Sequence, residues 1–422
     1  MSWGLFLLLF SLLAPAELWA DGPVTIEYIT DIEGNSDRFH DYLRKSGIFD
    51  LRANGEWGLK PGAHFVFGGD AMDRAAGDLE VLRFLVTQKE KYPDRVTLIL
   101  GNRDLNKMPL LDIAREFERD KDIKAATREV KAHLDGFNAR QSYEFRRTSL
   151  SQGGIPASDE TVTRSFLHEI EKGGLVRRYI ELGEIAKVID NTLFTHGMFT
   201  DKNAGRVPGV EKQVSNIREA TRLVNLWAEK QKQDWAAGRG GRALLDYQFA
   251  SETSLVNSHH FDADHNLLPT PEALVQKLRR QGITRIVSGH TPQGSTPMIA
   301  RQGGFEVVVG DNSYSPGNKA SLIQFRGSET LLAGELQDGR KVFSFTKIGD
   351  RTPIGKLIQD GHRVVGHLDT GEYVLFKYLP GYEPSIRLIG EDSLRRYFSG
   401  TPATCSSRFG RLLPAGITTS GR

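Results

Sequence analysis

The sequence of 422 residues predicts an α/β fold, and three observations support this prediction. Short apolar runs typical of buried strands alternate with stretches of helical apolar spacing from Val24 onward. The strand-like runs end beside glycines and polar side chains, as strands do when they aim their last residues at a common crevice. The composition, 39% hydrophobic and 26% charged, is that of an ordinary globular protein.

The expected core elements follow one another in a regular order. Helices are expected at residues 36–49 and 79–92, where apolar side chains recur at helical spacing. They separate the first three of the expected strands, which lie at residues 24–30, 63–69, 95–101, 192–197 and 285–290.

Two long charged stretches of helical character interrupt this order, at about residues 107–186 and 211–247. Neither carries a cluster of catalytic side chains, so we expect both to form a helical cap over the sheet edge. They lie within a main domain expected at residues 21–330.

After residue 330 the pattern changes to that of β-hairpins. Asp338-Gly339 and Asp360-Gly361 each precede a strand-like run, and Asp-Gly between strands is a strong hairpin signal. We therefore expect a small C-terminal β domain at residues 331–395, followed by a tail at 396–422.

Residues 1–20 have the pattern of a secretory signal peptide. The apolar run at residues 5–13 is too short to span a bilayer comfortably, and the A-x-A of residues 14–16 follows it. Because no Lys or Arg precedes Arg38, an uncleaved membrane anchor and a buried N-terminal helix stay open as alternatives. We expect an exported protein, in a periplasmic or lumenal compartment or secreted, with no membrane association after the signal is removed.

Charge and cysteine content exclude two classes of function. The net charge of +2 argues against a nucleic-acid binder that works through a broad basic face. The single cysteine, Cys405, excludes an intramolecular disulfide and any zinc or iron–sulfur site with several cysteines.

Polar residues with the chemistry of metal ligands follow five of the expected strands. A lone Asp in such a position is usually a helix N-cap, and a lone His is usually structural. Five such turns in one chain are hard to obtain as independent caps, and they predict a shared site. The residues are Asp31 and Glu33, Asp70 and Asp73, Asn102, His196 and His290.

The motifs G-D-A-M-D-R at residues 69–74, G-N-R-D at 101–104 and G-H-T at 289–291 resemble the calcineurin-like metallophosphoesterase superfamily. The Asp-Arg pair and the single-histidine G-H-T place the chain nearest the PPP-type phosphatase branch. The resemblance implies a metallophosphatase-like β-sandwich flanked by helices, over roughly residues 24–320.

The resemblance also implies a binuclear metal site. Asp31, Glu33 and Asp70 would hold one ion, and Asp70 would bridge to a second ion held by Asn102, His196 and His290. Two divalent ions would clamp a phosphoryl oxygen and activate a bridging hydroxide for in-line attack on phosphorus. Arg74 would pair with the phosphate oxygens in fork geometry.

Two positions depart from the family pattern. Glu33 stands where the family has His. A carboxylate at this position adds an oxygen ligand and so favours Mn²⁺, with Mg²⁺, Fe or Zn as alternatives. The other possibility is that Glu33 is not a ligand. Arg103 replaces the His that the family pairs with Asp73. Arg stays charged and cannot act as a general acid, so we expect it to pair with Asp73 and a phosphate oxygen instead.

Three further groups of residues have open roles. The segment with Asn312 and Tyr314 follows a strand-like run and either touches substrate or forms only a turn. Asn35 either orients a ligand or caps the helix that begins at Ser36. A cluster of side chains that could bind a metal is expected to form only a polar loop; the alternative is an additional metal site or a lid contact. The cluster consists of His259, His260, Asp262, Asp264 and His265.

The sequence thus predicts an exported phosphomonoesterase that depends on two divalent ions and acts on a phosphorylated substrate, such as a phosphoprotein. Asp73, Arg74 and Arg103 are the predicted catalytic residues, and the two arginines with Asn312 and Tyr314 are the predicted substrate contacts. Without a general acid the enzyme should favour good leaving groups such as phosphotyrosine. Two alternatives remain: a nucleotide or phosphodiester hydrolase on the same fold, and a catalytically weakened scaffold that binds a partner.

Overall fold

The protein is described from a computed structural model, which covers residues 24–250, 252–313, 317 and 319–399. The expected signal peptide, Tyr314, Cys405 and the part of the tail after residue 399 lie outside the described residues. No helix among the described residues is long and apolar enough to cross a membrane.

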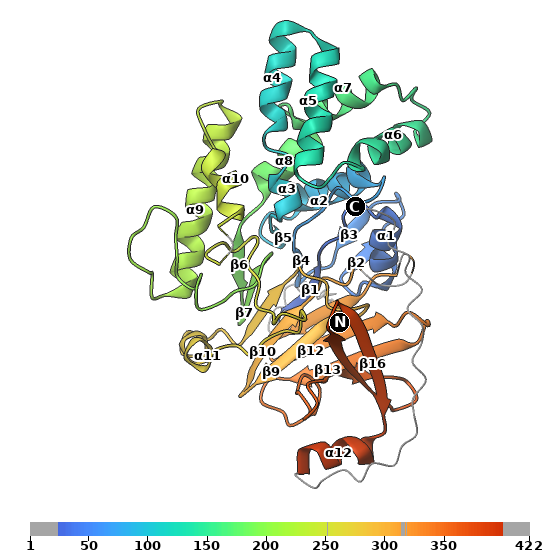
Figure 1. Cartoon of the computed structure of the whole chain (residues 1–422), viewed down its shortest axis with the longest axis vertical. Coiled ribbons are helices and arrows are strands. Elements are labelled where there is room, and N and C mark those ends of the chain that lie inside the picture. The colour runs from blue at the N-terminus through green and yellow to red at the C-terminus, as the bar shows by residue number, and fades with distance from the viewer. Residues whose placement is uncertain (1–23, 251, 314–316, 318, 400–422) are drawn as a thin grey trace, which may run out of the picture.

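Two large sheets form the centre of the molecule (Figure 1). The first has nine strands in the order β16-β15-β14-β13-β12-β11-β1-β4-β5, and the second has five in the order β6-β7-β8-β10-β9. A separate pair, β2-β3, lies beside α1 (Ser36–Lys45). The strands are β1 (Thr25–Ile29), β2 (Phe49–Leu51), β3 (Trp57–Leu59), β4 (Ala63–Phe67), β5 (Val96–Leu98), β6 (Ala186–Ile189), β7 (Thr192–Thr195), β8 (Arg285–Ser288), β9 (Met298–Gln302), β10 (Phe305–Val309), β11 (Leu322–Arg326), β12 (Glu329–Glu335), β13 (Lys341–Lys347), β14 (Arg363–His367), β15 (Tyr373–Leu379) and β16 (Glu383–Ile389).

Apolar side chains from both sheets pack against one another. Phe194 of β7 stacks on Tyr28 of β1 with ring centroids 5.8 Å apart, and it meets Phe325 of β11 edge-on at 6.0 Å. These three rings are almost completely buried, and burial of each such side chain contributes about 2–3 kcal/mol. The packing confirms the predicted α/β fold with a β-sandwich flanked by helices.

The strand directions place the ends of the predicted strands together. β1 pairs in parallel with β4, and β4 with β5, while β7, β8 and β10 form a parallel set in the second sheet. The carboxyl ends of parallel strands open on one edge of their sheet, which is where ligands bind in α/β proteins. The candidate metal centre lies at these edges.

Helices cover the sheets and form the two insertions. In Figure 1, α4 to α7 gather at one end of the molecule, and α9 with α10 stands beside β6. The two insertions touch, because Trp235 of α9 donates a hydrogen bond of 2.8 Å to the carbonyl of Met108, just before α4. The helices are α1 (Ser36–Lys45), α2 (Asp78–Lys91), α3 (Asn102–Leu105), α4 (Leu110–Asp120), α5 (Ile123–Gly136), α6 (Ser142–Gln152), α7 (Asp159–Ile170), α8 (Leu175–Leu182), α9 (Ile217–Ala236), α10 (Arg242–Gln248), α11 (Glu272–Arg279) and α12 (Glu391–Ser399).

The C-terminal strands continue the first sheet. β11 pairs antiparallel with β1, and β12 to β16 follow by successive antiparallel pairing. The Asp338-Gly339 turn joins β12 to β13, and Asp360-Gly361 directly precedes β14. The expected domain boundary at residue 331 therefore falls inside β12, and the expected tail begins within α12.

Candidate metal centre

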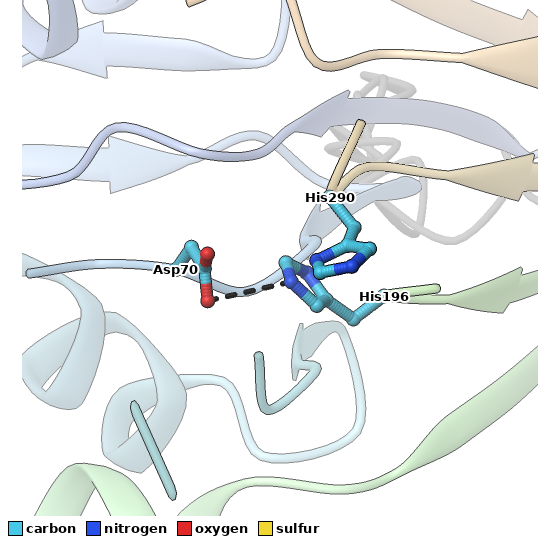
Figure 2. A group of neighbouring side chains, drawn as sticks. All are labelled: Asp70, His196 and His290. Carbon is cyan, nitrogen blue, oxygen red and sulfur yellow. Dashed lines mark ion pairs between the residues drawn. The ribbon is translucent and has the colours of Figure 1, made fainter. Parts of the chain in front are cut away.

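The ends of strands from both sheets meet at one place. Asp31 follows β1, Asp70 follows β4 and Asn102 opens α3 after β5, all from the nine-stranded sheet. His196 follows β7 and His290 follows β8, both from the five-stranded sheet. Figure 2 shows the His196 ring facing Asp70, with an ion pair of 3.3 Å between them, and the His290 ring next to that of His196.

Three of these side chains have the geometry of a metal site. Asp70, His196 and His290 each offer a ligand atom, and these atoms lie within 4.8 Å of one another. The Nε2 atom of His290 is buried and has no hydrogen-bond partner among the described residues. A buried ring nitrogen without a partner is costly, and a coordinated cation would satisfy it. The residues present therefore fit a divalent metal ion.

Asp31 and Asn102 border this group of ligands. The Asp31 carboxylate accepts the backbone N–H of His290 at 3.1 Å and the Thr30 hydroxyl at 2.6 Å. The Asn102 Oδ1 atom lies 3.3 Å from the Nε2 atom of His196. Both oxygens are thus next to the group, as the sequence predicts, and their role as ligands stays a prediction.

Buried carboxylates dominate the electrostatics of the site. Burial raises the pKa of Asp31 well above its usual range, and the neighbouring Asp311 and Asp70 carboxylates add to the effect. Burial acts to lower the pKa of His196, but Asp70 outweighs it and raises that pKa to about 10. Burial, and then His196, lowers the pKa of His290 to about 3, so its ring is neutral and able to bind a metal. Such a cluster favours cations.

Glu33 lies against two guanidinium groups. Its Oε1 atom is 2.7 Å from Nε of Arg103 and 3.0 Å from Nε of Arg74. Burial raises the pKa of Glu33 to about 7 despite these two cations. The arginines compensate the carboxylate charge without a metal, so the assignment of Glu33 as a ligand stays a prediction.

The cationic group closest to Asp73 belongs to Lys107, which was not predicted from the sequence. Arg103 Nη1 is 3.9 Å from Asp73, whereas Nζ of the buried Lys107 is only 2.6 Å away. The Ser142 hydroxyl of α6 donates to the same carboxylate at 2.9 Å. The expected Arg103–Asp73 pair is therefore the weakest of these contacts, because the Arg103 guanidinium turns toward Glu33. Lys107, four residues after Arg103, could have been found from helical spacing, but Ser142 could not.

Two buried carboxylates complete the surroundings of the ligands. Asp104, the last residue of G-N-R-D, accepts the backbone N–H groups of Asp70, Ala71 and Gly101 and so fixes the two motif loops together. Asp311, which follows β10, is buried beside Asp31. Neither carboxylate was predicted to belong to the site, although Asp104 ends the G-N-R-D motif and Asp311 directly precedes Asn312.

The remaining candidates lie in several places. Asn312 is buried and donates to the Ser321 hydroxyl. Asn35 caps α1, since its side chain accepts the Arg38 N–H at 3.0 Å. Within the histidine-rich cluster, Asp262 accepts backbone N–H groups of its own loop. His259 instead reaches the site, with its ring 4.8 Å from that of His290.

One curated protein is similar to this chain over a short segment. A segment of 41 residues is 54% identical to the serine/threonine-protein phosphatase sitA of Aspergillus fumigatus, but the match spans only 10% of this chain and 11% of the fungal protein.

Solved structures show more distant likeness. A cold-active protein-tyrosine phosphatase from a psychrophilic Shewanella species is 18% identical, with a TM-score of 0.46 over 78% of this chain and 81% of the other. A protein serine/threonine phosphatase from Saccharomyces cerevisiae is 14% identical, with a TM-score of 0.37 over 79% and 83%.

The model of the calcineurin-like phosphoesterase family matches residues 25–294, which is more than half of the chain. This range begins at β1, ends just after His290, and contains Asp31, Asp70, Asn102, His196 and His290. The chain therefore belongs to the calcineurin-like phosphoesterase family.

Proposed function

We propose that this protein is a phosphomonoesterase that depends on two divalent metal ions, with Mn²⁺ as the preferred metal. The observation that carries the proposal is the convergence of Asp70, His196 and His290 from two sheets, with the buried Nε2 atom of His290 left without a described partner. Arg103 lies 3.6 Å from Asp70 of this group, and Arg74 lies 3.0 Å from the neighbouring Glu33, so two guanidinium groups are available to bind a phosphate dianion.

We assign one ion to Asp31, Glu33 and Asp70, and the other to Asp70, Asn102, His196 and His290. When bound, the ions would polarise the phosphoryl group and lower the pKa of a water molecule near it. The acidic character of Asp31, Asp70 and Asp311 supports a site that attracts hard divalent cations.

The two arginines would hold the phosphate. The Arg74 side chain is 57% exposed and anchored at one end by Glu33, so its guanidinium is accessible to a substrate from solvent. The Arg103 side chain is only 11% exposed and lies 3.6 Å from Asp70, next to the metal ligands. Both would neutralise charge that builds up on the phosphoryl oxygens during hydrolysis.

The arginine at position 103 also bears on substrate preference. Because guanidinium does not release its proton near neutral pH, Arg103 cannot protonate a departing oxygen. Esters of acidic alcohols, phosphotyrosine among them, should therefore react faster than phosphoserine esters. The proposed substrate is a phosphoprotein. The proposed location is outside the cytoplasm, which the protein would reach by export.

Hydrolysis of an aryl phosphate with added Mn²⁺ tests the proposal. We expect turnover that a chelator removes and that Asp70→Ala lowers by at least about 10³-fold. Asp94→Ala, a change of an exposed aspartate outside the site, is the matched control and should keep full activity. Tyrosine and serine phosphopeptides of the same flanking sequence then test the leaving-group argument, which equal rates would contradict. Folded protein that turns over no ester with any divalent metal would favour the scaffold alternative.

A further inference from the structure

A cavity of about 330 Å³ lies directly beside the candidate metal centre. Its volume is at the lower end of the range for small-molecule sites, about 300–1,000 Å³, and suits one ring rather than a dinucleotide. The ring of His290, a proposed metal ligand, forms part of its wall. The other lining residues are Asn257, His259, His265, Thr291, Pro292, Tyr378 and Tyr382.

The lining of the cavity is largely aromatic. Neither a carboxylate nor a Lys or Arg is among the described residues that line the cavity. The His259 ring lies 4.8 Å from the His290 ring, and its Nδ1 atom is 3.1 Å from the Thr291 hydroxyl. Aromatic faces with scattered hydrogen-bonding groups accept a flat aromatic ring better than an alkyl chain or a charged group.

One ring pair at the cavity is held in an unusual backbone conformation. The rings of His265 and Tyr382 lie 3.9 Å apart, and the Tyr382 hydroxyl is hydrogen-bonded to Nε2 of His265. Both residues have positive φ angles, 66° and 64°. Bulky side chains rarely adopt this conformation, and such strain persists where the surroundings require it, often at functional sites.

The C-terminal strands fix this wall to the metal centre. The Tyr378 hydroxyl of β15 accepts the Gly294 N–H at 2.9 Å and donates to the Pro292 carbonyl at 3.3 Å, both in the loop after His290. Asn266, next to His265, exchanges two hydrogen bonds with the Tyr378 backbone. The β15–β16 hairpin, which lies beyond the segment matched by the family model, thus supplies a wall of the cavity.

We propose that this cavity binds the aromatic leaving group of the substrate, with the His265–Tyr382 pair as its specificity-determining wall. The proposal rests on the proposed phosphatase function and names the class of ester that the site takes: aryl phosphates, including tyrosine phosphate in a peptide. His290, a proposed metal ligand, is itself part of the cavity wall. A phosphate held at the metal centre would therefore place the ring attached to its ester oxygen within reach of the cavity.

The test separates ring recognition from leaving-group acidity. Phenyl phosphate is compared with hexafluoroisopropyl phosphate, an ester whose alcohol is similarly acidic but has no ring. We expect Tyr382→Ala to lower kcat/KM for phenyl phosphate about tenfold and to change that for the ringless ester less than about twofold. Tyr382→Phe, which keeps the ring, should retain most of the preference. Ile386→Ala, an exposed change on β16 outside the cavity, is the control for the hairpin.

Binding without turnover gives an independent readout. Calorimetry in the presence of Mn²⁺ should show that benzylphosphonate binds the wild-type protein about tenfold more tightly than methylphosphonate, and that Tyr382→Ala removes the difference. The cavity assignment would be overturned if Tyr382→Ala lowered kcat/KM equally for both esters. It would also be overturned if Tyr382→Ala changed neither kcat/KM for either ester nor the affinity for benzylphosphonate. Wild-type protein that hydrolyses neither ester would instead contradict the phosphatase proposal, while the phosphonate measurement would still decide whether the cavity takes a ring.

Discussion

Five residues of the site motifs have positive φ angles, although none is glycine: Asp31, Glu33, Asp70, Asp73 and His290. This conformation turns the chain sharply at each strand end and aims the side chain back over the sheet edge. It costs of order 1 kcal/mol or more at each position, and packing elsewhere has to offset it. The motif glycines beside these turns leave room for the ligands.

The Gly101 position tests how tightly the ligands are placed. A Cβ atom there would lie 2.1 Å from Oδ1 of Asp70 and 2.5 Å from its backbone nitrogen. We expect Gly101→Ala to displace Asp70 and to weaken Mn²⁺ binding at least about tenfold, as measured by calorimetry. Gly136→Ala, where a Cβ atom meets nothing within 4 Å, should bind Mn²⁺ like the wild type. Unchanged affinity in Gly101→Ala would mean that Asp70 is not a ligand.

The buried Lys107–Asp73 ion pair should contribute to the stability of the fold. Their side chains are 3% and 1% exposed, so removing one charge leaves the other buried without compensation. We expect Lys107→Met to lower the free energy of unfolding by about 3–5 kcal/mol in urea titrations. The double variant Lys107→Met/Asp73→Asn should recover part of that loss. If the single variant is as stable as wild type, Asp73 is compensated by another group.

Among the elements, α6 connects the first insertion to the site. Ser142 at its beginning donates to both the backbone carbonyl and the carboxylate of Asp73. Arg146, one turn later, lies 3.9 Å from Asp78 at the beginning of α2. The insertion is thus bonded into the loop that follows β4, and changes in α6 should reach Asp73 and Arg74, which are predicted to be catalytic.

Helix α5 carries a pH-dependent contact of the same insertion. The Nε2 atom of His133 lies 2.7 Å from the Asn106 carbonyl, and burial lowers the pKa of His133 below its usual value. A lowered pKa favours the neutral ring in the folded state, so this stability is present above about pH 6.5 and is lost as the pH falls through the folded pKa. Between pH 7.5 and 5, His133→Gln should lose less unfolding free energy than wild type in urea titrations. Parallel curves would contradict this.

The elements also show what the sequence could predict. β1, β4, β5, β7 and β8 were predictable, because each is a short apolar run that ends in a recognisable motif. The strand of the sheet beside which a hairpin pairs could not be predicted in the same way. An Asp-Gly turn specifies only the local pairing of β12 with β13, whereas β11 joins β1 by contacts such as Glu27 with Gln324, nearly 300 residues apart.

The same limit applies to the site. Ligand candidates were predictable from strand-end motifs, but the partners of Asp73 and Glu33 depend on side-chain directions that spacing does not determine. Arg103 was expected to face Asp73, yet Lys107 occupies that position and Arg103 contacts Glu33 at 2.7 Å. The cavity residues come from two loops and a hairpin that meet only in the folded chain.

At the scale of the whole molecule, one buried carboxylate joins the two sheets. Glu306 of β10 lies 3.1 Å from Arg285 and 3.4 Å from Arg301 in the five-stranded sheet. It also accepts hydrogen bonds from the hydroxyls of Thr330 and Thr346 in the nine-stranded sheet, at 2.6 and 2.8 Å. The sandwich is thus held by polar contacts as well as by its apolar core.

Glu306→Gln tests this link. The change leaves Arg285 buried without its carboxylate, and we expect a loss of about 3–5 kcal/mol of unfolding free energy. Thermal unfolding of the variant and of Glu335→Gln, a change at the partly exposed end of β12, provides the comparison. A loss no greater than that of the control would show that the apolar core alone holds the sheets together.

The proposed metal ligands come from two sheets, and this has a consequence for folding kinetics. Asp31 and His290 are 259 residues apart, and the site exists only after both sheets have formed and docked. An ion that needs both halves cannot nucleate folding, but it holds the finished sandwich closed. Mn²⁺ should therefore slow unfolding in proportion to its binding free energy and leave the refolding rate nearly unchanged. Stopped-flow measurements with and without the ion would show this, and faster refolding would mean that part of the site forms early.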